Sequence, residues 1–234
     1  IGGTIVSKRL RQFLRKCTCK TSIIVNESGA CCDTFMNATD IIQGRVEDVI
    51  GIFAYETEDV QKKDFVSLWS KAFNKALAIR GTIKPRFSQM LAVKAFHEKM
   101  REEAIDGEFF YGNSSAVRLG NIFSDQYLYV NRGVNGIEGS LSTAVGYAIA
   151  HQEEEDVYCV IGDLSFFYDQ NALWNESLSP NLSILLLNNG GGGIFHQLSG
   201  LERSPYRDSA IAAQHTTSAE GICQTHDIVY LSTR

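Results

Sequence analysis

The chain has 234 residues, of which 44% are hydrophobic and 21% are charged, and its formal net charge at pH 7 is −5. This length allows one large domain or one and a half smaller ones. The negative charge argues against a general nucleic-acid-binding protein, which normally carries a basic face. No apolar run reaches the roughly 18 residues of a membrane span, so we expect neither a nucleic acid nor a membrane as partner.

Six cysteines occur, but no two of them form a C-x-x-C pair, so a structural zinc site has little support. Reduced thiols are usual in a cytoplasmic protein, and we expect a cytoplasmic location. The chain starts at Ile1 without Met and without a signal-peptide pattern. Because it also stops at Arg234 directly after an apparent strand, we expect it to be a piece of a longer protein.

The first 80 residues alternate between strand-like and helix-like segments, which predicts part of an α/β domain entered midway. Ser7 is a natural N-cap for a basic amphipathic helix. Gly81 to Pro85 interrupts the helical pattern, so we place a domain boundary there, between residues 1–80 and residues 81–234. The predicted elements of the first domain are strands over 4–6 and 22–25, a helix over 8–16, an apolar run over 46–53 and a helix over 64–79.

The second domain continues this alternation and predicts a parallel sheet with helices on both faces. His97 lies beside the apolar stripe of its first helix, and we interpret it as a partly covered, structural histidine. The predicted helices cover residues 87–104, 115–123, 139–150 and 209–224. The predicted strands cover residues 109–111, 127–130, 157–161, 182–187 and 228–231.

Two of these strands, 157–161 and 182–187, end in polar turns. Gly162-Asp163 follows the first strand, and Asn188-Asn189 with the four glycines Gly190 to Gly193 follows the second. Short apolar runs of this kind fit buried parallel strands, whose carboxyl ends lie at one edge of the sheet. Open α/β sheets bind their ligands at that edge.

The two turns carry oxygen ligands. Asp163 offers carboxylate oxygens, Asn189 offers an amide oxygen, and the glycines let backbone groups approach a ligand closely. One carboxylate, one amide and one carbonyl suit a hard divalent ion such as Mg²⁺, which keeps positions open for phosphate oxygens. The alternative is an ordinary strand-to-helix turn with a helix cap, followed by a mobile glycine loop.

Two further strands end in polar turns, Asn113-Ser114 and Asn131-Arg132. All four turns would lie at one edge of one parallel sheet. Their convergence predicts a site for an anionic ligand.

Basic residues accompany these turns. Arg118 follows Ser114 by one helical turn, and with Arg132 it is suited to hold carboxylates by bidentate hydrogen bonds. Lys8 and Arg9 begin a helix of the first domain and are further candidates for the same cleft. The alternative for each is a surface ion pair, which contributes little.

The segment Gly162-Asp163-Leu164-Ser165 followed by Asn188 to Phe195 resembles the diphosphate-binding motif of the thiamine-diphosphate enzymes. The residues of this motif are similar to those of one branch of these enzymes, the 2-succinyl-5-enolpyruvyl-6-hydroxy-3-cyclohexene-1-carboxylate synthases (MenD). Further segments resemble signatures of that branch in the same order: Ser7-Lys8-Arg9, Asn113-Ser114 through Arg118, Asn131-Arg132-Gly133, and Gly136 to Gly139.

The resemblance implies a role for each matching position. A metal ion would be held by Asp163, Asn189 and the carbonyl of Gly191. The cofactor would contact Gly162, Asp163, Leu164, Ser165 and Asn189, and Ile137 would wedge thiamine into its bent shape. Substrate carboxylates would bind to Lys8, Arg9, Ser114, Arg118 and Arg132, the last two with a catalytic role, and Ile194 and Phe195 would form an apolar wall at the reaction centre.

The family reaction implied by the resemblance is a transfer in menaquinone biosynthesis that depends on thiamine diphosphate and Mg²⁺ (or Mn²⁺). It decarboxylates 2-oxoglutarate and adds the succinic semialdehyde unit to isochorismate, in a homo-oligomer. The family takes an activating glutamate from an N-terminal pyrimidine-binding domain, for which no segment precedes Ile1. We therefore expect this chain alone to be inactive.

Two alternatives stay open. The first is another thiamine-diphosphate carboligase or decarboxylase that uses a different 2-oxo acid. The second is a non-catalytic phosphate- or nucleotide-binding module, although neither G-x-x-x-x-G-K-[ST] nor a strand-linked G-x-G-x-x-G occurs.

Overall fold

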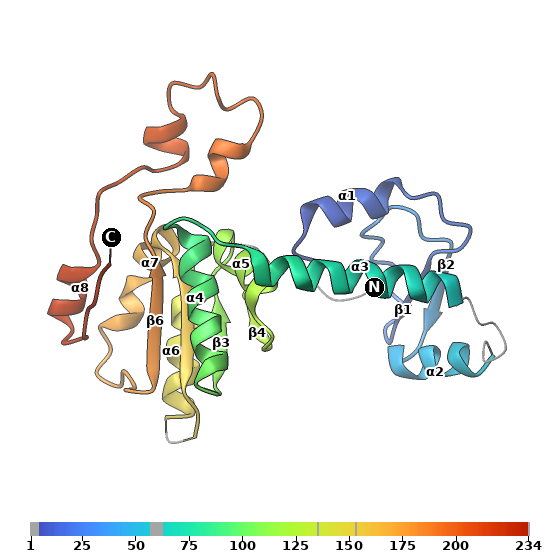
Figure 1. Ribbon diagram of the computed structural model, residues 1–234, viewed down its shortest axis with the longest axis horizontal. Coiled ribbons are helices and arrows are strands. Elements are labelled where there is room, and N and C mark those ends of the chain that lie inside the picture. Colours follow the sequence, from blue (N-terminus) through green and yellow to red (C-terminus); the bar gives the residue numbers. More distant parts are fainter. Residues whose placement is uncertain (1–4, 57–62, 135, 153, 234) are drawn as a thin grey trace. The chain divides into compact units, whose positions relative to one another are not determined.

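The computed structural model describes residues 5–56, 63–134, 136–152 and 154–233. The chain divides into two compact units, residues 1–82 and 83–234, both of which combine helices with parallel strands (Figure 1). That the first unit belongs to a central domain and the second is a cofactor-binding domain stays a prediction.

The first unit contains a two-stranded parallel sheet in which Ile23 lies opposite Asp40. Ser7 caps the first helix as predicted, because its hydroxyl accepts a hydrogen bond from the Leu10 N–H at 3.2 Å. The elements are α1 (Lys8–Lys16), β1 (Ile23–Asn26), β2 (Asp40–Gln43), α2 (Val46–Glu56) and α3 (Lys63–Thr82).

One prediction for this unit is wrong, and two segments without an assigned structure are now defined. Ile5 and Val6 are not in a strand, and Thr4 lies outside the described residues. The apolar run over 46–53 is helical, since it is part of α2. The short strand β2 has only two apolar residues and largely exposed side chains, so its sequence carries almost no strand signal.

The second unit is built on a four-stranded parallel sheet with the order β4-β3-β5-β6. Its strands are β3 (Glu108–Tyr111), β4 (Leu128–Tyr129), β5 (Val157–Gly162) and β6 (Leu182–Leu187). Its helices and helical turns are α4 (Gln89–Glu102), α5 (Ser115–Phe123), α6 (Ser140–Ala150), α7 (Asp163–Tyr168), η1 (Gln170–Leu173), η2 (Gly193–Gln197), η3 (Arg207–Ile211) and α8 (Glu220–Thr225).

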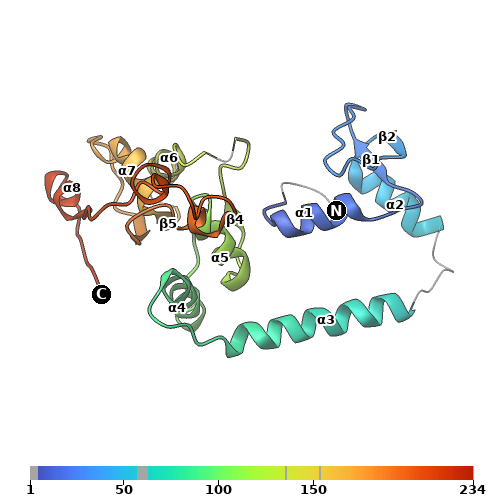
Figure 2. The same ribbon diagram turned by 90° about the horizontal axis from the view of Figure 1, so that it is seen from above.

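Helices cover both faces of this sheet, which confirms the predicted fold class. Seen along the strands in Figure 2, α4 and α5 lie on one face, and α6 and α7 lie on the other. Alternate residues of β5 such as Val157, Cys159 and Ile161 are fully buried and belong to the core that α6 and α7 share with the sheet. None of the helices in the described part of the chain has the length and apolarity to cross a membrane.

The predicted elements at the end of the chain are wrong. The helix predicted over 209–224 is formed only at its two ends, where η3 overlaps its start and α8 overlaps its end. Backbone groups between them pair with the glycine loop instead, since the Gly192 N–H donates to Ala212 at 2.7 Å and the His215 N–H donates to Gly190 at 3.0 Å. Residues 228–231 form no strand, and Val229 and Leu231 are almost fully exposed.

Candidate functional site

Four polar turns follow the four parallel strands of the second unit. Because these strands run in the same direction side by side, the turns lie at one edge of the sheet. The register pairs Gly162 at the end of β5 with Leu187 at the end of β6. The Gly-Asp and Asn-Asn turns therefore begin level with each other.

Asp163 joins these two turns. It is the first residue of α7 and its side chain is buried, with a residue exposure of 2%. Its Oδ1 accepts the Leu164 N–H at 2.7 Å, whereas its Oδ2 accepts the N–H groups of Gly190 at 2.7 Å and Gly191 at 3.0 Å. The carboxylate thus holds the glycine loop next to the end of β5.

Asn189 directly precedes this loop, and its Oδ1 accepts a hydrogen bond from Gln89 Nε2 at 2.7 Å. Gln89 is the first residue of α4, and it also approaches the carbonyl of Leu187 at 3.5 Å. The neighbouring Asn188 donates from Nδ2 to the carbonyl of Thr217 at 2.9 Å. Both asparagine side chains are therefore oriented by partners from distant parts of the sequence.

The conformation of the loop depends on glycine at two positions. Gly190 and Gly191 have φ values of +76° and +147°, which side chains with a Cβ rarely adopt. A Cβ on Gly190 would lie 2.9 Å from the carbonyl oxygen of His215, and one on Gly191 would lie 2.9 Å from that of Ala212. The segment 207–217 therefore packs directly on the backbone of the loop.

The donors at this edge fit a hard divalent ion. Asp163 and Asn189 provide side-chain oxygens, and the Gly191 carbonyl, which accepts the Gly193 N–H at 3.0 Å, keeps a second lone pair. Mg²⁺ is typically bound by one or two carboxylates together with phosphate oxygens. Among the described residues no group of three or more His, Cys, Asp or Glu side chains is suited to hold a metal.

A second cluster lies where β3 and β4 end. Asn113 is buried, and its Nδ2 donates to the carbonyls of Asn131 at 2.8 Å and Gly136 at 2.6 Å. Its Oδ1 accepts a hydrogen bond from Arg132 Nη1 at 2.8 Å. Asn113 therefore fixes both Arg132 and the loop that leads to Ile137.

Ser114, next to this cluster, has φ +70° and ψ −124°, a combination that is unfavourable for a residue other than glycine. Strained backbone of this kind concentrates at functional sites. Arg118 is exposed on α5, one turn after Ser114. These two residues lie at the same end of the sheet as Arg132.

The remaining predicted site residues belong to several elements. Gly162 ends β5, and on α7 Ser165 is buried while Leu164 is half-buried. Half-buried side chains also occur at Ile137, Ile194 and Phe195, the last two in η2. Lys8 and Arg9 are exposed in the first turn of α1, in the other unit.

Two other features of the second unit do not resemble a site. His97 is more buried than predicted, with 2% exposure, and its Nε2 lies 2.5 Å from the Tyr111 hydroxyl. Burial lowers the pKa of His97 to about 4, so it is neutral near pH 7. It therefore acts as a structural residue between α4 and β3.

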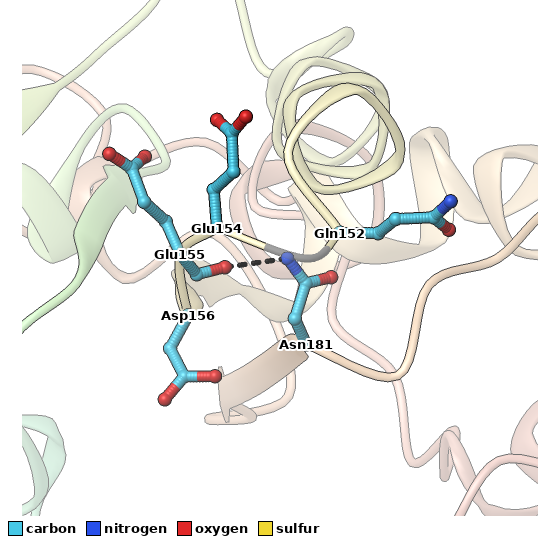
Figure 3. Close-up of a pocket in the computed structure, with 5 residues that line it drawn as sticks. All are labelled: Gln152, Glu154, Glu155, Asp156 and Asn181. Carbon is cyan, nitrogen blue, oxygen red and sulfur yellow. Dashed lines mark hydrogen bonds between the residues drawn. The ribbon is translucent and has the colours of Figure 1, made fainter.

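A cavity of about 230 Å³ lies at the opposite end of the sheet, before β5 and β6. Figure 3 shows that the carboxylates of Glu154 and Glu155 extend to one side, whereas that of Asp156 extends to the other. The Asn181 side chain, which also lines the cavity, donates to the carbonyl of Glu155 at 2.6 Å. The lining residues thus do not converge on a common ligand.

Sequence reasoning missed two residues of the candidate site, Gln89 and His215. His215 Nε2 lies 3.3 Å from Asp163 Oδ2. Gln89 begins a helix, and His215 lies within a segment that was predicted to be helical. Neither position has a neighbouring motif, so only the fold reveals their proximity to the predicted ligands.

The relatives found among known proteins share one name, although no protein-family model matches the chain. The chain is 38% identical over 234 residues to the 2-succinyl-5-enolpyruvyl-6-hydroxy-3-cyclohexene-1-carboxylate synthase of Bacteroides thetaiotaomicron. It is 39% identical over 235 residues to the synthase of the same name from Bacteroides fragilis, and 34% over 233 residues to that of Phocaeicola vulgatus. Each match covers 98% of this chain but only 40% of the relative, so the chain spans less than half the length of these curated relatives.

Proposed function

The chain belongs, over its matched length, to the family of 2-succinyl-5-enolpyruvyl-6-hydroxy-3-cyclohexene-1-carboxylate synthases, and we propose that it carries the thiamine-diphosphate and Mg²⁺ site of such an enzyme. Since the matches cover 40% of each relative, the activity is proposed for the full-length protein. The observation that carries the proposal is the buried Asp163 carboxylate, which holds the glycine loop next to Asn189.

In this proposal the protein is a transferase of menaquinone biosynthesis that is cytoplasmic and homo-oligomeric. It decarboxylates 2-oxoglutarate and adds the resulting four-carbon unit to isochorismate. Bound thiamine diphosphate would supply the electron sink that carbanion chemistry requires. The chain's own residues bind and orient the reactants around it.

We assign the cofactor end of the site to the turns after β5 and β6. Asp163, Asn189 and the Gly191 carbonyl would hold Mg²⁺ (or Mn²⁺), because all three offer the hard oxygen donors that these ions prefer. Gly162, Leu164 and Ser165 would lie beside the diphosphate. Ile137 would support the bent form of thiamine, since its loop is fixed by the bond from Asn113 to Gly136.

We assign the substrate end to the turns after β3 and β4. Arg132 is held by Asn113, which is the kind of restraint that favours bidentate binding of a carboxylate. Ser114 and Arg118 would contribute further contacts from the start of α5. Ile194 and Phe195 would form an apolar wall that lowers the local polarity at the reacting carbon.

Calorimetry on the full-length protein tests the assignment of the cofactor. We expect thiamine diphosphate to bind in a manner that requires Mg²⁺, and we expect binding to be lost in the variant Asp163→Asn. Glu154→Gln, at the opposite end of the sheet, is the matched control and should bind as the wild type does. Equal binding by Asp163→Asn and the wild type would contradict the proposed site.

A substrate profile then separates this function from the remaining candidates. The proposed enzyme releases CO₂ from 2-oxoglutarate and forms the adduct only when isochorismate is present. A preference for another 2-oxo acid would identify a different thiamine-diphosphate enzyme. Binding of ATP or NAD without any binding of thiamine diphosphate would identify a phosphate-binding module instead.

A further inference from the structure

His215 is a side chain without an assigned role that lies against the proposed metal ligand. Its Nε2 is 3.3 Å from Asp163 Oδ2, and both side chains are largely buried, with exposures of 16% and 3%. Phe167 of α7 packs edge-on against the imidazole, at a centroid distance of 5.3 Å. The ring is therefore held in place by α7, the same helix that Asp163 begins.

The hydrogen bonds of His215 determine which nitrogen carries the proton. The Thr217 N–H donates to Nδ1 at 3.1 Å, so Nδ1 is an acceptor. In a neutral imidazole the proton then lies on Nε2, the atom that faces Asp163. Nε2 is buried, and within the described part of the chain no group forms a hydrogen bond of good geometry with it. The Asp163 carboxylate, at 3.3 Å, is thus an available acceptor for an otherwise unsatisfied donor.

His215 also contacts the glycine loop through its backbone. Its N–H donates to the carbonyl of Gly190 at 3.0 Å, and its own carbonyl oxygen is the atom that a Cβ on Gly190 would meet. One residue therefore contacts both the Asp163 side chain and the loop that follows Asn189. The positions of these two parts relative to each other must stay fixed if both are to bind the same ion.

We propose that His215 is a positioning residue of the metal site, whose Nε2–H donates to Asp163 Oδ2 and fixes the orientation of the carboxylate. Oδ2 already accepts the N–H groups of Gly190 and Gly191, so the histidine would add a third donor to this oxygen and further fix its position. Oδ1, with the Leu164 N–H as its partner, would then be the oxygen left for the cation. The inference rests on the proposed function, because it assumes that Asp163 is a metal ligand.

Two variants separate this role from simple packing. His215→Phe keeps a ring against Phe167 but removes the donor, whereas His215→Gln keeps an N–H donor on a shorter, flexible side chain. His151→Phe is a matched control, because His151 also stacks on an aromatic ring and pairs with a carboxylate, Glu154 Oε2, at 3.1 Å. That pair lies next to the cavity at the far end of the sheet.

The measured quantity is the affinity of the full-length protein for Mn²⁺ with thiamine diphosphate present. The electron paramagnetic resonance signal of free Mn²⁺ reports how much of the ion stays unbound. Hydrogen-bond partners of metal ligands typically affect affinity by about 10- to 100-fold, so His215→Phe should weaken Mn²⁺ binding by about 10-fold or more. His215→Gln should stay closer to the wild type, and His151→Phe should equal it. Circular dichroism checks that each variant is folded.

Wild-type affinity in His215→Phe, or equal losses in His215→Phe and His215→Gln, would overturn the inference and leave the proposed function intact. If His215→Phe does not fold, His215→Met replaces it, because Met and Gln have nearly the same shape and differ in the donor. Equal Mn²⁺ affinity of that pair also overturns the inference. If the wild type binds no Mn²⁺ with thiamine diphosphate, the proposed function and the inference both fail.

Discussion

Asn113 uses every polar atom of its side chain to connect the turns after β3 and β4. Its replacement by Ala would leave the carbonyls of Asn131 and Gly136 without donors and Arg132 Nη1 without this acceptor. A hydrogen bond contributes about 0.5–1.5 kcal/mol, so Asn113→Ala, which removes all three of these bonds, should lower the free energy of unfolding by about 1.5–4.5 kcal/mol. Asn121→Ala, which removes one bond within α5, should cost less; equal losses in thermal unfolding would contradict this reading.

Arg132 is expected to recognise a substrate carboxylate. A hydrogen bond to a charged group contributes about 1.5–3 kcal/mol, so Arg132→Ala should raise KM for one substrate by roughly 10- to 100-fold. Arg132→Lys should recover only part of this loss, because an ammonium group does not reproduce the planar fork of guanidinium. Steady-state kinetics of the full-length protein measure the effect. Unchanged kinetic constants in Arg132→Ala would exclude this role.

Gly190 and Gly200 provide a comparison between steric conflict and backbone strain. Both have positive φ values, +76° and +94°, but only a Cβ on Gly190 meets another atom, the carbonyl oxygen of His215. Gly200→Ala should cost about 1–2 kcal/mol of stability from strain alone. Gly190→Ala should cost more and should also weaken binding of thiamine diphosphate with Mg²⁺. If the two variants lose the same stability and both keep full binding, the packing of segment 207–217 on the loop is not required for stability or for cofactor binding.

At the scale of elements, the contact between α4 and β3 should make stability depend on pH. Burial, with a smaller contribution from the Arg101 charge, lowers the pKa of His97 from 6.5 to about 4. Between these pH values the unfolded chain binds a proton that the folded chain excludes. The contribution of neutral His97 to the free energy of unfolding is therefore fully present above pH 6.5 and is lost as the pH falls toward 4. At about 1.4 kcal/mol for each pKa unit, the loss is about 3 kcal/mol.

Urea denaturation between pH 7 and pH 4.5 tests this dependence. His97→Gln should show a shallower loss of stability than the wild type, because Gln does not titrate. His151→Gln, which changes a half-buried histidine at the far end of the sheet, is the control and should follow the wild-type curve. A pH dependence that stays the same in His97→Gln would show that His97 does not contribute to it.

The elements also show what the sequence could predict and where it failed. Strong apolar patterns gave α5, β5 and β6 within one residue, since each of these elements buries apolar side chains inside the second unit. The helix predicted over 209–224 failed because its backbone bonds to the glycine loop, which is a tertiary contact that no local pattern reports. For the same reason the motifs marked Asp163 and Asn189 but gave no sign of Gln89 or His215.

At the scale of the whole molecule, the two units differ in how much apolar surface they bury. Among the described residues of the first unit, Val49 is the only buried apolar residue, whereas Val157, Leu141 and many others are buried in the second. On α3, large side chains including Phe65, Trp69 and Phe73 are more than half exposed. Helices of this kind obtain most of their stability from packing an apolar face, which the first unit does not provide by itself.

We therefore expect residues 1–82 to show no cooperative thermal unfolding when they are expressed alone. Residues 83–234 should unfold cooperatively, because their sheet is covered on both faces. Near-ultraviolet circular dichroism on heating measures both. A sharp transition in the isolated 1–82 segment would show that its core is more complete than the buried residues indicate.

The most direct test of the proposed site is a crystal structure of the full-length protein grown with thiamine diphosphate and Mn²⁺, with anomalous scattering used to locate the metal. We predict one anomalous peak with the Asp163 carboxylate, the Asn189 amide oxygen and the Gly191 carbonyl at about 2.1–2.2 Å, close to the octahedral Mg²⁺ distances. A peak that does not contact both Asp163 and Asn189, or bound cofactor without a metal between these two turns, would contradict it.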